Sequence, residues 1–158
     1  HQIFIINQKG WTMDMLGSSY VLLGIFSIIG LIFGGPIIDK YNTKKIILFA
    51  LLPLFLGVLT LIFFDSYFSM LVYMSLLGLN LGITAPFIGS LWAELYGLES
   101  LGSVKALLHA CGVFASALSP VIFGYIIDAG FGIVAISVIS LVIIIVSTSL
   151  PIFYKHIE

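Results

Sequence analysis

Charge is scarce in this chain of 158 residues, which has no arginine, six lysines and seven acidic residues. Only 8% of its residues are charged, against about 25% in an ordinary soluble domain. A soluble protein of this length could not cover its surface with so few polar groups. Six dispersed lysines also form no basic patch, so we expect no nucleic-acid partner. A composition that is 61% hydrophobic predicts an integral membrane protein.

Cysteine is almost absent as well, since Cys111 is the single one. One cysteine excludes a disulfide framework and a cysteine-based metal cluster, and it is most simply a small buried residue. The sequence has no His-Glu-x-x-His run, so a zinc protease is unsupported. We therefore expect neither a metal nor a cofactor.

The few charges leave five long windows without any charged residue. Each window has 19 to 28 residues, and a membrane-spanning helix needs about 20. Barrel strands would alternate strictly over about 10 residues, which these windows do not. We therefore predict an all-α fold, a polytopic membrane helix bundle that forms one membrane domain over residues 1–158. The five predicted complete transmembrane helices are 15–38, 46–64, 66–93, 106–127 and 129–154.

The first 11 residues are too short and too polar to span a bilayer, and they do not look like a signal peptide. They resemble the outer end of a helix and its exit loop. We expect them to be the remnant of a sixth helix, whose upstream part would belong to a missing N-terminal half of the same chain.

The lysines predict the orientation in the membrane. If the five helices alternate in direction, five of the six lysines lie on one side and only Lys9 lies on the other. Lysine-rich loops face the cytoplasm. We therefore expect a multi-pass protein of the plasma or bacterial inner membrane, with the loop after residue 38 and the C-terminus in the cytoplasm.

Glycine is concentrated in the predicted helices 15–38, 66–93 and 106–127. Small residues let helices approach closely in lipid, so we expect these three helices inside the bundle. The helices 46–64 and 129–154 should face lipid. Two stripes with a spacing of four predict packing seams or, as a sharper alternative, hinges at their prolines. The stripes are Gly78, Gly82, Pro86, Ser90 and Gly112, Ser116, Pro120, Gly124.

Polar residues also occur near the middle of the predicted spans, where transporters bind their substrates. One face of helix 66–93 combines Tyr73, Asn80, Thr84 and Phe87, and the neighbouring spans contribute Ser27 and Ser116. These six residues are candidates for lining a pore or contacting a substrate. Alternatively, Asn80 forms a hydrogen bond between helices, and the serines bond the backbone of their own helices.

The loop after the first predicted span contains the most specific motif. Its residues are Gly35, Asp39, Lys40, Asn42, Lys44 and Lys45. This pattern resembles the cytoplasmic loop signature of the major facilitator superfamily, in which Asn42 replaces the usual glycine. Asparagine also adopts the left-handed turn geometry, so the replacement is tolerable.

A second region, from Trp92 to Asp128, resembles the tenth and eleventh helices of bacterial members of that superfamily. The resemblance implies that Glu94 pairs with the basic residues of the loop signature, as a cytoplasmic gate, and that Lys105 replaces a frequent arginine. It also implies that the five spans are helices eight to twelve of a twelve-helix secondary active transporter. Such a protein moves a small solute by alternating access, and we expect this solute to be an organic anion. A drug or metabolite efflux pump and a non-transporting scaffold or receptor of the same fold are the alternatives.

His109 is a candidate for proton coupling, because its charge changes near neutral pH. The alternative is a hydrogen-bonded histidine at the membrane interface. An intramembrane serine protease would need Ser18 or Ser19 to meet His109. The predicted orientation puts those groups at opposite membrane faces, so we expect no enzyme.

Overall fold

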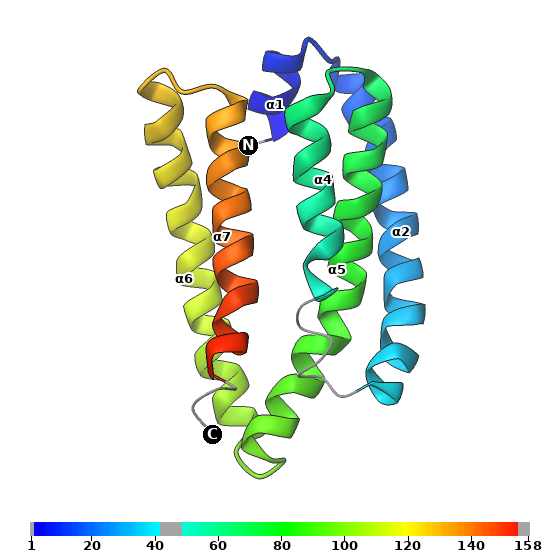
Figure 1. Cartoon of the computed structure of the whole chain (residues 1–158), viewed down its shortest axis with the longest axis vertical. Coiled ribbons are helices and arrows are strands. Elements are labelled where there is room, and N and C mark those ends of the chain that lie inside the picture. The colour runs from blue at the N-terminus through cyan, green and yellow to red at the C-terminus, as the bar shows by residue number, and fades with distance from the viewer. Residues whose placement is uncertain (1, 42–48, 155–158) are drawn as a thin grey trace.

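The computed structural model describes residues 2–41 and 49–154, and within these ranges the chain is a bundle of helices without strands. The helices run alternately up and down, side by side (Figure 1). They are α1 (Gln2–Lys9), α2 (Met13–Lys40), α4 (Leu52–Phe63), α5 (Tyr67–Tyr96), α6 (Leu101–Asp128) and α7 (Ile133–Tyr154). The all-α helix bundle expected from the charge-free windows is confirmed, and α1 occupies the stretch expected to be the end of a helix.

Local sequence explains where the helices begin and end. The Thr12 side chain accepts a hydrogen bond from the Met15 N–H at 3.3 Å and so caps the start of α2. At the other end of the bundle, α5 stops at Gly97, whose φ of 72° is a conformation that glycine adopts readily. Three of the described helices are long and apolar enough to cross a membrane: α2, α5 and α6. Two shorter apolar helices lie at 52–63 and 133–149.

The closest helix pairing in the described bundle is that of α2 with α5. A Cβ added to Gly30 would lie 2.6 Å from the Leu79 carbonyl oxygen, and Cβ atoms on Gly78 and Gly82 would collide with the backbone of α2. The two backbones therefore touch without side chains between them. The stripe that begins at Gly78 is a packing seam, as its spacing indicated.

The stripe on α6 forms no such seam within the described residues. A Cβ on Gly112 or Gly124 would meet nothing within 4 Å, and α6 has no buried residue. Figure 1 shows α6 at the edge of the bundle, away from α2. The expectation that span 106–127 lies inside the bundle is therefore not met among the described helices, because α6 contacts α5 only sparsely.

Span 46–64 was expected to face lipid, and its described part, α4, has one face packed against other helices of the chain. Helix α4 packs on α5, which buries Val58 and Leu61, and α7 packs in turn on α4. A Cβ on Gly57 would be in ordinary contact with Tyr73 of α5. Large apolar side chains and the buried Gly57 together build this interface.

Candidate functional site

The polar centre of α5 forms a hydrogen bond with the backbone just before α4. Asn80 is buried, and its side-chain amide donates a hydrogen bond to the carbonyl oxygen of Ala50 at 2.8 Å. One turn further on, the Thr84 hydroxyl donates to the Asn80 carbonyl at 2.8 Å. The amide thus forms the interhelical bond that the sequence had allowed as one of two roles for Asn80.

The aromatic members of the same face are buried too. The Tyr73 hydroxyl accepts a long hydrogen bond of 3.5 Å from the Gln2 side chain of α1. Phe87 packs with Ile38 of α2 and with Ala50. Tyr73, Asn80 and Phe87 therefore lie in contacts between helices of this chain, whereas Thr84 is only half-buried.

The two candidate serines lie apart from each other. Ser27 is half-buried on α2, beside Gly82 of the seam. Ser116 is exposed on α6 and donates to the carbonyl of Val113 in its own helix at 2.8 Å. The structure thus brings Ser27 close to α5 but leaves Ser116 on a helix that has few contacts with α5.

The hollows of the described surface do not coincide with these polar residues. One of about 270 Å³ lies between α4 and α5, and one of about 170 Å³ lies between α4 and α7. None of the residues predicted to contact a substrate lines either hollow. These two hollows therefore do not correspond to the solute site that the sequence predicted.

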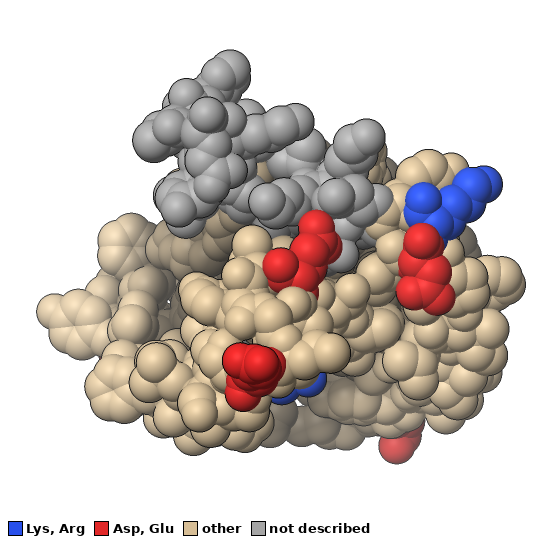
Figure 2. All heavy atoms as spheres, turned by 90° about the horizontal axis from the view of Figure 1, so that it is seen from below, with Lys and Arg blue, Asp and Glu red and all other residues tan. Residues whose placement is uncertain are grey.

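The signature residues gather at one end of the bundle. Asp39, Lys40, Glu94 and Lys105 are all exposed there, and Gly35 is half-buried. Figure 2 looks onto this end and shows acidic side chains at several separate places. The Lys40 ammonium lies 5.4 Å from the centre of the Tyr41 ring. Asn42, Lys44 and Lys45 lie outside the described residues, so the expected pairing of Glu94 with Lys44 or Lys45 stays a prediction.

His109 is exposed on α6. In residues 2–41 and 49–154, no group of three histidine, cysteine or acidic residues is placed to hold a metal ion. Ser18 lies near the start of α2, where its hydroxyl is 2.7 Å from that of Tyr67. The starts of α2 and α6 lie at opposite ends of the bundle (Figure 1), so Ser18 and His109 are far apart.

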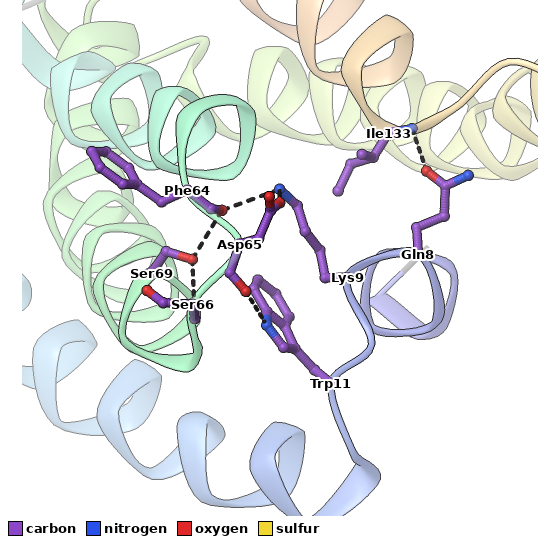
Figure 3. A network of polar contacts seen from close by, with 8 residues as sticks. All are labelled: Gln8, Lys9, Trp11, Phe64, Asp65, Ser66, Ser69 and Ile133. Carbon is purple, nitrogen blue, oxygen red and sulfur yellow. Dashed lines mark hydrogen bonds and ion pairs between the residues drawn. The ribbon is translucent and has the colours of Figure 1, made fainter.

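A polar network at the end opposite the signature was missed by the sequence analysis (Figure 3). The Lys9 ammonium forms an ion pair with the Asp65 carboxylate and donates to the Phe64 carbonyl at 3.1 Å. The Trp11 indole N–H donates to the Asp65 carbonyl at 2.8 Å. These bonds attach the α1–α2 connection to the turn between α4 and α5.

The same short segment also reaches the last helix. The N–H of Ile133, the first residue of α7, donates to the Gln8 side-chain oxygen at 2.6 Å. Gln8 thus caps the N-terminus of α7, at which Ile133 is buried. A signal for the network did exist in the sequence, because Lys9 and Asp65 are opposite charges predicted on the same membrane face.

Comparisons with known proteins relate the chain to membrane transporters. The sequence pattern of the Major Facilitator Superfamily matches residues 2–158. The chain is also similar to a D-xylose transporter from Levilactobacillus brevis, with 28% identity over 102 residues. The similar region is 65% of this chain but only 21% of that relative. No solved structure matches the chain. With a match that extends over nearly all of its residues, the chain belongs to the Major Facilitator Superfamily.

Proposed function

We propose that this chain forms the C-terminal half of a secondary transporter, which moves a small solute across the membrane by alternating access. The family match over residues 2–158 is the observation on which the proposal rests. The bundle architecture supports it. The α2–α5 pair is closely packed, and α6 is a long apolar helix without a buried residue in the described chain. An exposed helix of this kind is suited to face a second half of the protein across a solute pathway.

We further propose that the solute is uncharged and rich in hydroxyl groups, such as a pentose. The charged residues of the described spans lie near the helix ends, so the mid-membrane polar groups are hydroxyls and an amide. Ser27, Thr84 and Ser116 are the candidates for contact with the solute, because none of them is fully buried. The similarity to a D-xylose transporter points to the same class of solute.

An organic anion remains the second candidate, on account of the loop signature. A buried anion needs a fixed cation or strong hydrogen-bond donors. The described lysines, Lys9, Lys40 and Lys105, all lie near helix ends. The cation for an anionic solute would therefore have to come from the other half of the transporter.

Uptake into proteoliposomes that contain the full-length protein tests the proposal. Labelled D-xylose and labelled succinate represent the two solute classes, and protein-free liposomes are the control. We expect saturable uptake of the sugar, with inhibition by unlabelled sugar. Uptake of succinate alone would support the organic anion, and uptake of neither compound or any related solute would support the non-transporting alternative. The purified chain of residues 1–158 should not transport, because the pathway lies between two halves.

A further inference from the structure

The start of α4 contains a break in the helix that the sequence windows did not reveal. Phe49 and Ala50 are helical, Leu51 is a turn residue with φ −93° and ψ −2°, and α4 begins at Leu52. Its backbone bonding starts with the Phe55 N–H, which donates to the Leu51 carbonyl at 2.9 Å. Pro53 explains the break, because proline has no N–H and its ring clashes with the carbonyl four residues earlier.

The break leaves a carbonyl group in an apolar place. Ala50 is 2% exposed and packs against Ile38 and Phe87. Irregular backbone at membrane depth is tolerated only where protein groups replace the lost hydrogen bonds. The Asn80 amide supplies such a bond to the Ala50 carbonyl at 2.8 Å. An amide in the middle of α5 thus replaces the helix hydrogen bond that the Ala50 carbonyl lacks at the break.

Asn80 is itself held in a fixed position. It lies between Gly78 and Gly82, at which the backbones of α2 and α5 are in direct contact. A rotation of α5 would drive one helix into the other there. The Thr84 hydroxyl bonds the carbonyls of Asn80 and Leu81, so its bonds stay within α5. The amide therefore projects from the part of α5 whose backbone is packed directly against α2.

We propose that Leu51–Pro53 is a hinge in α4 and that Asn80 locks it. The hydrogen bond to Ala50 fixes the direction of α4 relative to the α2–α5 pair. Without the bond, the Ala50 carbonyl loses its partner and α4 pivots about Leu51. Asn80 is then a positioning residue, and it has no need to touch the solute. The hinge is independent of the solute, and only its effect on transport rests on the proposed function.

Hydrogen exchange of the full-length protein tests the lock directly. Asn80→Leu removes the amide, and we expect the first bonded backbone N–H groups of α4, those of Phe55 and Leu56, to exchange about 10-fold faster, as a lost buried hydrogen bond predicts. Adding Pro53→Ala should suppress this gain, because a continuous helix lets the Leu54 N–H bond the Ala50 carbonyl. The side chain introduced by Asn80→Ser is too short to reach Ala50. This milder variant should therefore also speed exchange at the start of α4.

Thr84→Val is the matched control. It removes a polar group from the same face of α5, but that group bonds only α5 itself. Exchange at the start of α4 should therefore stay unchanged. The hinge is refuted if both Asn80 variants leave that exchange unchanged, or if Pro53→Ala fails to suppress the increase.

Transport measurements separate a positioning role from contact with the solute. If Asn80 is a lock, Asn80→Leu lowers the rate per inserted molecule, leaves KM unchanged and is rescued by Pro53→Ala. If Asn80 instead binds the solute, KM rises and Pro53→Ala does not rescue it, which would overturn the positioning role. A wild-type protein that transports nothing would refute the proposed function and leave the exchange result as the test of the hinge.

Discussion

Lys9 shows how unequal the two members of an ion pair can be. Its side chain is only 5% exposed, whereas that of Asp65 is 82% exposed. The pair itself is worth about 0–1 kcal/mol, because water screens the carboxylate. Lys9 also donates to the Phe64 carbonyl and fills space beside the turn between α4 and α5. Lys9 therefore contributes more than Asp65 to the stability of this contact.

We predict that Lys9→Met destabilises the protein more than Asp65→Asn does. Loss of the buried donor should cost about 1–3 kcal/mol, and loss of the exposed carboxylate about 0–1 kcal/mol. Asp65→Asn is the matched control, because it keeps the backbone carbonyl that Trp11 bonds. Thermal unfolding of the full-length protein in detergent measures both variants. Equal losses would show that the ion pair, and not the lysine, stabilises this end.

Asn80 was recognisable from the sequence as a mid-membrane polar group, but its hydrogen-bond partner was not. The acceptor is a backbone carbonyl, and any residue at position 50 would offer one. Pro53 was the available signal, since a proline near the start of a span leaves carbonyls without donors. The Gln8 cap of α7 was equally unpredictable, because the Gln8 side-chain oxygen accepts from the N–H of a residue 125 positions later in the sequence.

Among the helices, the pairing of α2 with α5 depends above all on Gly78 and Gly82, at which an added Cβ would lie closest to the α2 backbone. We predict that Gly82→Ala destabilises the protein by about 1–3 kcal/mol, the usual cost of overpacking, because its Cβ would strike the Ser27 carbonyl oxygen. Gly89→Ala is the matched control on the same helix, since its Cβ would meet nothing within 4 Å. That change should be neutral or stabilising by up to about 1 kcal/mol. Unfolding in detergent compares the two variants, and a tolerated Gly82→Ala would contradict the seam.

The helices themselves were predictable from the charge-free windows, but their neighbours were predictable only in part. Glycine spacing located the α2–α5 seam because a close approach requires small residues there. Helix α4 has large apolar residues on all sides, such as Leu54 and Leu61, and the same side chains suit lipid and protein. Its packing on α5 therefore has no distinct signature in the sequence.

For the whole molecule, the lysine distribution predicts the orientation. In a Cys111→Ala background, Lys105→Cys should react with a membrane-impermeant thiol reagent from the cytoplasmic side. Asp128→Cys, at the other end of α6, should react from the outside. Both positions are exposed, so a failure to react would not arise from burial. Labelling in intact cells and in inverted vesicles distinguishes the sides, and the opposite pattern would reverse the orientation.

Asp39 provides a test of the proposed gate. We predict that Asp39→Asn preserves membrane insertion but slows transport roughly 5–150-fold, the range of a coupling of about 1–3 kcal/mol between two conformations. Glu99→Gln is the control, because Glu99 is an exposed acidic residue in the connection between α5 and α6, outside the loop signature. Transport rate per inserted molecule is the measurement. A normal transport rate for Asp39→Asn would show that Asp39 has no role in the gate.

The seam between α2 and α5 also has a consequence for biosynthesis. Helix α4 lies between the two partners in the sequence, so α2 leaves the ribosome long before the residues that fit its glycines exist. At about 5–20 residues per second, α5 is complete about 3–11 s after Lys40 has been added. During that interval the surface of α2 around Gly30 lacks the α5 backbone that covers it in the folded bundle. A nascent chain stopped after α4 would therefore expose this surface to the cell's quality control, whereas one stopped after α5 would already have it covered.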